Sequence, residues 1–577
     1  MVMKKLISLV LVLALTLSLC AVATADTEKV FRTYLGSDTP ILNGHNSVET
    51  SLDTPIGYCG ATLYRTVVDE TRLNYKYIGD IAADLPEEVS ENVWQIKLRP
   101  EACWANGEPI NADTVMYSFK MLLDPNLSNQ MADFLSDYNI TIVNAKEYSK
   151  QTSDAPVAWE DVGIKKVDDY TIEITTTSTV TAQNVCSQFT NRATAMVYEP
   201  YYEAGMNEDR TATTYGLTAD QWMSAGPYKL DTWVHDSVQT YVRNEKYWQP
   251  ELFKFDRVEV RIIKEMNARV ELWEKGELDY LSPDLNTIET YIDDPRLVQN
   301  SSIDVYHIDV NCKNPENPVS GSINYRKALY HAMNREVIAR SIFGYQEPSG
   351  TYVNGQAGMF SGLAYRDSEA GKAVTARVEE WGPYGYNPEL AREYLAKAYE
   401  ECGVPEDTVI TIILAIGDDE TAWKATGEYL QEQLPVIFEG KVQLKFDIYA
   451  GISATTYKQG TDVWDLSPND RARGASRTYP YTCFYYYLTT YGSHPNNFFD
   501  EEFEAQYAVC DSDEVKADYP RLLEETAKLE NIYLDKVIHI PMVQEVGYQL
   551  ISDRLELPVD DYIPGFGWGL MYADVIE

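Results

Sequence analysis

Residues that could carry chemistry are scattered along this sequence and form no recognised catalytic or metal-binding pattern. The six histidines lie far apart, without an H-E-x-x-H pair, and the cysteines lack zinc-ligand spacing. There is no G-x-S-x-G elbow and no Walker loop. Among 89 acidic residues, neighbours such as Asp418 and Asp419 are expected in solvated loops rather than as a glycosidase pair. These absences lower the odds of an enzyme without excluding one, since triad members can lie anywhere in sequence. We expect no cofactor and no metal.

Aromatic side chains are abundant instead. The chain has 43 Tyr, 11 Trp and 15 Phe, which are flat apolar groups with polar edges, suited to gripping a ligand in a cleft. Most of them belong in hydrophobic cores, and a chain of 577 residues is long enough for two or three lobes. The aromatic content therefore favours binding but identifies no site.

The elements that would position a site follow an α/β pattern. Residues 29–35 (KVFRTYL) predict a strand. Residues 258–281 predict a strand, a helix and a second strand, which implies a parallel βαβ crossover. Residues 409–449 repeat this pattern, with the apolar run VITIILAI as a strand covered on both faces. Asn324 is expected to cap a helix over 325–343, and Asn387-Pro388 to open a helix that Gly403 ends.

Ligands of such sheets bind where loops leave the carboxyl ends of the strands. This rule selects the loops after Leu35, after Leu281 and after a predicted strand at 463–466. A ligand-binding cleft is thus expected before any comparison is made.

The first residues have the layout of an export signal. Lys4 and Lys5 precede the apolar run 6–19, and an A-x-A cleavage site ends at Ala25. We favour cleavage after Ala25 and an extracellular or cell-envelope protein. Lipid anchoring at Cys20 is the alternative, but a leucine precedes this cysteine where lipoprotein signals have a small residue.

Net charge, apolar runs and cysteine content limit the partners, membrane segments and disulfides that we expect. A formal net charge of −41 repels phosphate backbones and anionic lipid, so nucleic acid is not an expected partner. The remaining apolar stretches are too short to cross a bilayer. Beyond the leader, seven scattered cysteines argue against a disulfide framework, leave one pair open, and are expected mainly as small buried hydrophobes.

Several segments, in order, resemble the extracellular solute-binding proteins of the oligopeptide, dipeptide and nickel ABC transporters. The strongest is 94–125, with WANGEPINADTV similar to the W-x-N/D-G-x-P-x-x-A-x-D-V core of that family. Five more support it: 226–233 (GPYKLDTW), 243–248 (RNEKYW), 324–344 (NYRKALYHAMNREVIARSIFG), 387–398 (NPELAREYLAKA) and 539–542 (HIPM). The ordered set is specific although no single motif is decisive.

The resemblance implies a periplasmic-binding-protein-like (type II) α/β fold, a two-lobed clamshell with an additional third domain. It places lobe I at 26–60, 186–303 and 537–577, domain II at 61–185, and lobe III at 304–536. It also implies capture of a ligand by lobe closure and delivery to an ABC permease in the membrane. We expect the protein to act as a monomer.

Three places are expected to bind ligand, where the resemblance and the strand-end rule agree. Tyr280 and Ser282 follow the first βαβ unit, and Tyr306 and His307 lie on the strand that crosses between lobes. For His307, a hydrogen bond to backbone in the hinge is an equal alternative. The third place is the segment that aligns with the family pattern G-W-x-x-D-Y-x-D/E-P: Arg473, Gly474, Arg477, Thr478 and Tyr479.

This chain departs from the family pattern at its most informative position. Peptide binders have an aspartate there that pairs with the α-amino group of the ligand, whereas this chain has Thr478, with Arg471, Arg473 and Arg477 close by. The arginines either contact a ligand or offset an acidic surface. We therefore expect a small peptide or peptide-like solute, with an oligosaccharide or another anionic or polar solute as the alternative. Rival classes are an exported hydrolase and a surface sensing or adhesion protein.

Overall fold

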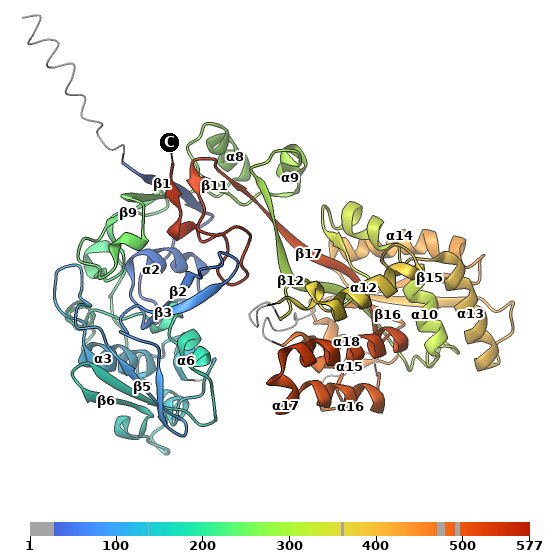
Figure 1. The fold of residues 1–577 in the computed structure, drawn as a ribbon, viewed down its shortest axis with the longest axis horizontal. Helices are drawn as coiled ribbons and strands as arrows, with labels where there is room; N and C mark the ends of the chain where they lie inside the picture. Colours follow the sequence, from blue (N-terminus) through green and yellow to red (C-terminus); the bar gives the residue numbers. More distant parts are fainter. Residues whose placement is uncertain (1–27, 137, 359–362, 470–478, 491–496, 577) are drawn as a thin grey trace, which may run out of the picture. The chain divides into compact units, whose positions relative to one another are not determined.

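The first strand, β1 (Val30–Leu35), forms where the alternating run after the leader predicts it. The computed structural model describes residues 28–136, 138–358, 363–469, 479–490 and 497–576. These residues form two units (Figure 1). Unit 1 contains the chain up to Asp284, Asp294–Arg296 and the segment from Leu550 onward, and unit 2 contains Leu285–Asp293 and Leu297–Gln549. The predicted division into three domains stays a prediction.

The main sheet of unit 1 has the strand order β1-β10-β9-β8, with β8 at Tyr228–Val234, β9 at Val238–Arg243 and β10 at Arg257–Ile262. β1 and β10 run parallel, from Val30 opposite Arg257 to Leu35 opposite Ile262. The helix α8 (Met266–Glu274) then leads to the short strand β11 (Tyr280–Leu281).

The predicted ladder within residues 258–281 needs a correction. β10 has its parallel partner in β1, whereas β11 pairs antiparallel with the end of β17 (His539–Ile551), Tyr280 opposite Ile551. A strand of two residues offers few ladder hydrogen bonds, and β1 already occupies the edge of β10. Sequence periodicity cannot reveal this, because β1 lies over two hundred residues earlier.

Two of the other sheets of unit 1 are antiparallel and are formed by strands between β1 and β8. β2 (Tyr64–Val68) pairs with β3 (Tyr75–Gly79). The other sheet has the order β4-β5-β7-β6, and buried residues alternate with more exposed ones along β5 (Val93–Lys97) and β7 (Thr171–Thr175). Its remaining strands are β4 (Glu87–Ser90) and β6 (Ile164–Asp168).

The helix α3 (Ala112–Leu123) follows β5 along the chain. Asn111 caps it by accepting a hydrogen bond from the Thr114 N–H at 3.2 Å. Its apolar face, Val115, Phe119 and Leu122, is fully buried.

In unit 2 the strand order is β17-β12-β16-β14-β15, where β12 spans Leu297–Val310, β16 Leu466–Asn469, β14 Ile410–Gly417 and β15 Val442–Tyr449. β14 runs parallel to β15 through the helix α14 (Thr421–Ile437), which confirms the second predicted βαβ unit. β16 begins three residues later than the predicted start at residue 463 and pairs antiparallel with β12.

One predicted helix is interrupted. α10 (Ile323–Ala332) is capped by Ser322, whose hydroxyl accepts from the Tyr325 N–H at 3.0 Å, and Asn324 instead donates to Glu401. The chain leaves the helix at Met333 and restarts with Asn334 as a new cap. In contrast, α13 (Pro388–Cys402) begins after Asn387 and ends at Gly403 with φ 66°, as predicted.

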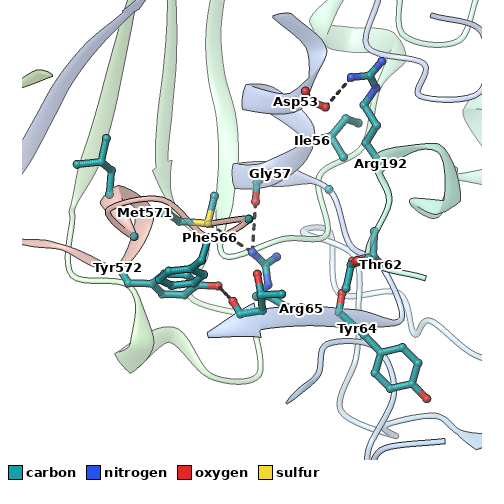
Figure 2. A pocket seen from close by; sticks show the side chains of 16 residues that line it. Asp53, Ile56, Gly57, Thr62, Tyr64, Arg65, Arg192, Phe566, Met571 and Tyr572 are labelled. Carbon is teal, nitrogen blue, oxygen red and sulfur yellow. Dashed lines mark hydrogen bonds and ion pairs between the residues drawn. The ribbon is translucent and has the colours of Figure 1, made fainter. Parts of the chain in front are cut away.

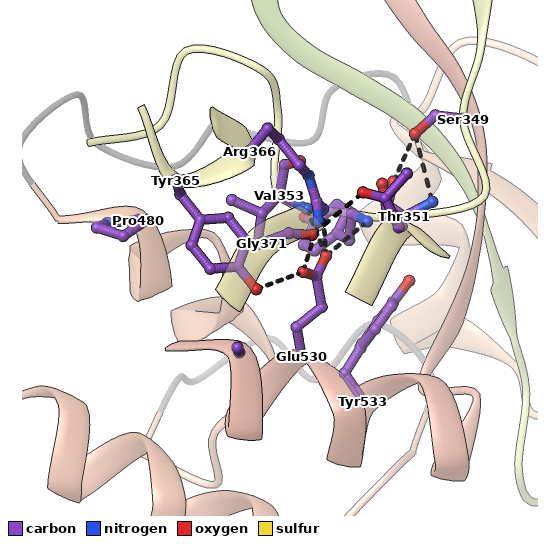
Figure 3. Close-up of polar contacts among 12 residues, drawn as sticks. Ser349, Thr351, Val353, Tyr365, Arg366, Gly371, Pro480, Glu530 and Tyr533 are labelled. Carbon is purple, nitrogen blue, oxygen red and sulfur yellow. Dashed lines mark hydrogen bonds and ion pairs between the residues drawn. The ribbon is translucent and has the colours of Figure 1, made fainter. Parts of the chain in front are cut away.

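A buried carboxylate organises the interior of unit 2 (Figure 3). Glu530, on α18 (Tyr519–Lys536), is fully buried and accepts from the N–H groups of Tyr352 and Val353 at 3.2 and 3.1 Å. It also accepts from the Tyr365 hydroxyl at 2.9 Å and pairs with the Arg366 guanidinium. One helix residue thereby fixes a segment that has little regular structure of its own.

Two further predictions concern disulfides and membrane-spanning helices. The seven cysteines from Cys59 onward are free thiols, four of them buried (Cys59, Cys186, Cys483 and Cys510), so the open possibility of one disulfide is not realised among them. Of the helices in the described ranges, none has the length and apolar character needed to cross a membrane.

Candidate ligand-binding site

Two predicted site residues meet at the carboxyl end of β1. Tyr34 lies at this end, and its ring stacks on Tyr280 of β11 with 6.3 Å between ring centroids and 24° between planes. The Tyr34 hydroxyl accepts a hydrogen bond from the Ser282 N–H at 3.0 Å. An aromatic pair and a backbone turn thus gather where β1 ends, which is one of the places that the strand-end rule selects.

Arg269 of α8 fixes the Tyr34 ring. Its guanidinium lies 4.6 Å from the ring centroid, and it donates to the carbonyls of Ile263 at 2.8 Å and Lys264 at 3.0 Å. Gly36 leaves room for this arrangement, because a Cβ there would lie 3.0 Å from the Arg269 side chain. We interpret Arg269 as the residue that orients Tyr34.

Asp279 links the start of β11 to β1. Its side chain is 1% exposed, accepts from the Arg32 N–H at 2.9 Å and forms an ion pair with Arg554 at 2.5 Å. Its own N–H donates to the Arg32 carbonyl at 2.8 Å. The backbone of Tyr280 therefore has a fixed position relative to Tyr34.

Asp38 holds the loop that leaves β1. Its carboxylate accepts from the Trp233 indole N–H at 3.1 Å, the Gln239 amide at 2.8 Å and the Asp236 N–H at 3.0 Å. All three donors lie on or between β8 and β9, so this hairpin sets the path of the loop after Leu35 that the sequence singles out.

In unit 2, Tyr306 and His307 lie on successive positions of β12 and have different surroundings. The partly buried Tyr306 donates its hydroxyl to Glu545 at 2.9 Å and packs against Phe343, with ring centroids 5.7 Å apart. His307 is 1% exposed, and its Nε2 lies 3.0 Å from the Tyr487 hydroxyl. Its Nδ1 lies 3.4 Å from the Val305 carbonyl. This is a backbone contact of the kind expected if His307 serves the strand rather than the ligand.

His307 belongs to a buried charged cluster. Asp309, two residues further along β12, forms an ion pair with Lys458 at 2.6 Å and lies 3.4 Å from His307 Nε2. Burial alone would raise the pKa of Asp309, but the Lys458 ammonium and His307 outweigh it, so the pKa of this carboxyl lies well below its ordinary value. The cluster is therefore charged and paired inside the protein.

His539 of β17 closes the cluster on its apolar side. Its ring lies 4.0 Å from that of His307 and is surrounded by Tyr352, Tyr487 and Tyr533, with ring centroids 4.2 to 4.9 Å away. Burial and then His307 hold the pKa of His539 well below its ordinary value, although Asp309 opposes this shift. The imidazole is consequently neutral.

The third predicted place falls largely outside the described residues. Arg473, Gly474, Arg477 and Thr478 all lie there, and so does Arg471. Tyr479 is described: it packs against the core of unit 2, with its ring 6.1 Å from that of Tyr481.

Tyr34 and Arg269 are not among the residues expected at the site from the sequence. Tyr34 had a signal, since it stands immediately before the strand end at Leu35 that the strand-end rule selects. Arg269 had none, because its contact with Tyr34 depends on how α8 packs. No group of three histidine, cysteine or acidic side chains suited to a metal occurs within the described ranges.

A family model for the bacterial extracellular solute-binding proteins, family 5 (middle region), matches residues 76–489, well over half of the chain. The chain belongs to this family. The predicted recognition is confirmed, and because the family consists of solute-binding proteins, the expectation that the chain is not an enzyme is confirmed too.

Solved structures show that this family 5 protein has the expected fold. The murein tripeptide binding protein MppA in its unliganded open form is similar with a TM-score of 0.69 and 16% identity, over 95% of this chain and 98% of that one. An oligopeptide ABC transporter substrate-binding domain from Bacillus anthracis gives 0.55 and 20%, over 96% of this chain and 100% of that one. The α/β, binding-protein-like fold class is thereby confirmed.

The matches between this family 5 protein and its curated relatives cover a smaller share of each chain. The oligopeptide-binding protein OppA of Bacillus subtilis is 24% identical, over 65% of this chain and 64% of its own length. The dipeptide-binding protein DppE of the same organism is 26% identical over 51% of each chain. The matches thus span between half and less than two thirds of these relatives.

Proposed function

We propose that this protein is the extracellular substrate-binding component of an ABC importer, which captures a small peptide or peptide-like solute and delivers it to a membrane permease. Membership of family 5 supports a binding role, and similar proteins are named for oligopeptide or dipeptide binding, one of them from Listeria monocytogenes in a structure bound to peptide. The observation within this chain that carries the proposal is the Tyr34, Tyr280 and Ser282 cluster at a strand end.

Each unit by itself offers candidate residues for ligand contact. In unit 1, Tyr34 and Tyr280 offer aromatic faces, held by Arg269. In unit 2, Tyr306 and Tyr479 are the partly buried aromatic candidates. His307, buried in its cluster, is proposed to hold β12 in place rather than to be reached from solvent.

The predicted charge preference belongs to the same proposal. Arg473, Gly474, Arg477 and Thr478 are proposed to present an arginine-rich face to the ligand. An anionic or neutral polar solute is the second candidate, because Thr478 replaces the expected aspartate and guanidinium groups suit carboxylates. Arg477→Ala or Arg473→Ala should then weaken ligand binding about tenfold to a hundredfold, as expected for a charged hydrogen bond.

Export, processing and oligomeric state are also part of the proposal. The protein is exported with cleavage after Ala25, lipid anchoring at Cys20 being the alternative, and acts as a monomer with the three-domain division given above. An intact mass that begins at Asp26 would support cleavage, and an acylated Cys20 would replace this proposal.

Mass spectrometry of solutes that co-purify with the protein, followed by calorimetry, tests the proposed function. A peptide or peptide-like solute that binds with one-to-one stoichiometry supports it. Ligand at about a hundred times its dissociation constant should add roughly 2.7 kcal/mol to the free energy of unfolding, and scattering should show a more compact protein. Exclusive recovery of a sugar, with no binding of mixed peptides, would overturn the peptide assignment.

A further inference from the structure

Strand β3 of unit 1 has an outer edge that faces away from its neighbour β2. In the described chain these two strands form a sheet of their own, with Tyr77 opposite Thr66. Across this sheet the Asp80 N–H donates to the Leu63 carbonyl at 2.9 Å. Hydrogen-bonded pairs alternate with non-bonded pairs along an antiparallel ladder, so the pair of Tyr77 and Thr66, three positions away, is a non-bonded pair. The N–H and carbonyl groups of this pair therefore point to the outer edges of the two strands.

The outer edge of β2 is covered, whereas that of β3 is not. On β2, the Tyr64 N–H donates to the Phe189 carbonyl at 3.3 Å. The Thr66 carbonyl accepts a hydrogen bond from the Tyr572 hydroxyl at 2.6 Å (Figure 2). On β3, neither the N–H nor the carbonyl of Tyr77 has a hydrogen-bond partner within the described part of the chain. Such an open strand edge is a template for pairing with a further strand.

A cavity of about 670 Å³ follows this open edge. It is lined by four consecutive residues of β3, 76–79. Because successive side chains of a strand point to opposite faces, a cavity that contacts all four residues lies along the edge of the strand. Residues 83–85 and several residues between 248 and 254 form further walls. None of the lining residues belongs to the Tyr34 and Tyr280 cluster.

The walls of this cavity are largely apolar. The apolar side chains that line it include Val67, Ile78, Trp248, Leu252 and Pro558. Arg99 holds the Trp248 ring, with its guanidinium 3.5 Å from the ring centroid and its Nε donating to the Asp80 carbonyl at 3.3 Å. Leu85 also lines the cavity and is 55% exposed. The open edge therefore has apolar surface beside it that an added strand would cover.

Positive charge predominates around the cavity. Lys76, Arg99 and Lys254 line it, against the acidic residues Asp84 and Glu251, in a chain whose formal net charge is −41. The Lys254 ammonium donates to the Glu251 carbonyl at 2.7 Å and forms no ion pair with a carboxylate of the described residues. Lys76 pairs with an acid that is 82% exposed, and such surface pairs contribute little. Both ammonium groups can therefore meet a carboxylate of a partner.

We propose that β3 binds an extended acidic segment of a partner protein as an added strand. The segment exchanges main-chain hydrogen bonds with Tyr77, and every second side chain faces the cavity. An apolar side chain of the segment covers Leu85, and its carboxylates meet the ammonium groups of Lys76 and Lys254. This docking edge is separate from the proposed peptide capture and gives the protein a second kind of partner.

Titration calorimetry of the mature protein with the capped peptide acetyl-Glu-Val-Phe-Val-Glu-amide tests the proposal. Saturable binding is expected, and the lysine counterpart acetyl-Lys-Val-Phe-Val-Lys-amide should bind at least about tenfold more weakly, because it brings like charges together. N-methylation of alternate amides removes the donors from one edge of the peptide. Methylation of one set should weaken binding about threefold to tenfold and methylation of the other should leave it unchanged, since only one edge of an added strand faces β3.

Two variants of the protein locate the peptide on this edge. Tyr77→Pro removes the outward N–H without removing a hydrogen bond to β2, and should weaken binding about threefold to tenfold. Leu85→Ala should weaken it about threefold or more, because it removes apolar surface that the peptide covers. Leu73→Ala changes a leucine of similar exposure, 52%, that does not line the cavity. It is the matched control and should leave the affinity unchanged.

Several results would contradict the proposal: no saturable binding of the acidic peptide, equal binding of its lysine counterpart, or full affinity in both Tyr77→Pro and Leu85→Ala. Loss of binding in Tyr280→Ala would place the peptide at the strand-end cluster, and the edge assignment would be wrong. A dimer of the protein alone that Tyr77→Pro dissociates would assign the edge to a second copy instead. If Tyr77→Pro fails to fold, the methylated peptides still decide, because full affinity of both excludes an added strand.

Discussion

The Lys458 ammonium lies 2.6 Å from the Asp309 carboxylate, and both side chains are almost completely buried. Removing one partner leaves the other charge buried without compensation. Lys458→Met should therefore lower the free energy of unfolding by about 3–5 kcal/mol, measured by urea denaturation.

The double variant Lys458→Met, Asp309→Leu distinguishes two causes of instability: the loss of the ion pair, and the burial of one unpaired charge. It should recover much of the stability, because two apolar side chains replace two buried charges. Lys275→Met, which breaks an exposed pair with Glu271, is the control and should cost less than about 1 kcal/mol. A double variant as unstable as the single one would contradict this account.

Stability should fall as the pH drops below about 6.5. Burial lowers the pKa of His45 to about 3 and that of His331 to about 4, and holds that of His539 well below its ordinary value. Above pH 6.5 these groups are neutral in both states. Between pH 6.5 and the folded pKa the unfolded chain binds protons that the folded chain excludes, so at pH 5 His45 and His331 each lower the free energy of unfolding by about 2 kcal/mol. His539 contributes with the same sign.

Urea unfolding at pH 7.5 and pH 5 measures this dependence. His331→Gln should reduce the difference between the two pH values by about 2 kcal/mol, even if it lowers stability at both. An undiminished difference would show that the pKa of His331 is not depressed by its burial.

Glu530→Gln should destabilise unit 2 strongly. The variant keeps an acceptor for the N–H groups of Tyr352 and Val353 but leaves the buried Arg366 without its counter-ion. The expected loss is about 3–5 kcal/mol in thermal or urea unfolding. Glu525→Gln, on the same helix and paired with the exposed Lys528, is the control. Equal effects of the two variants would contradict the role assigned to Glu530.

Tyr280→Ala should weaken binding of the co-purified solute about threefold to tenfold, since an aromatic contact contributes about 0.5–1.5 kcal/mol. Calorimetry measures the affinity, and Tyr138→Ala, an exposed tyrosine of unit 1, is the control. Arg269→Gln should have a smaller effect of the same sign because it acts through Tyr34. Full affinity in Tyr280→Ala would remove the cluster from the binding site.

Much of the local structure was predictable because its causes are close in sequence. Asn387 caps the start of α13, and Gly403, in the left-handed conformation, ends it. The alternation of apolar and polar residues marks β5 and β7. The interruption after α10 was missed because the sequence there keeps a helical apolar pattern up to residue 343, and the Met333 backbone departs from it only in the folded protein.

By itself, the sequence determined the α/β class, the second strand-helix-strand unit with its parallel strands, and the family. It also predicted loops where a ligand should bind, and this stays a prediction. Tertiary structure alone decided which residues meet there. The Tyr34 hydroxyl reaches Ser282 across 248 positions, and Lys458 reaches Asp309 across 149. Short-range patterns record backbone preference and burial, whereas such contacts depend on how distant strands and helices pack, which no local periodicity encodes.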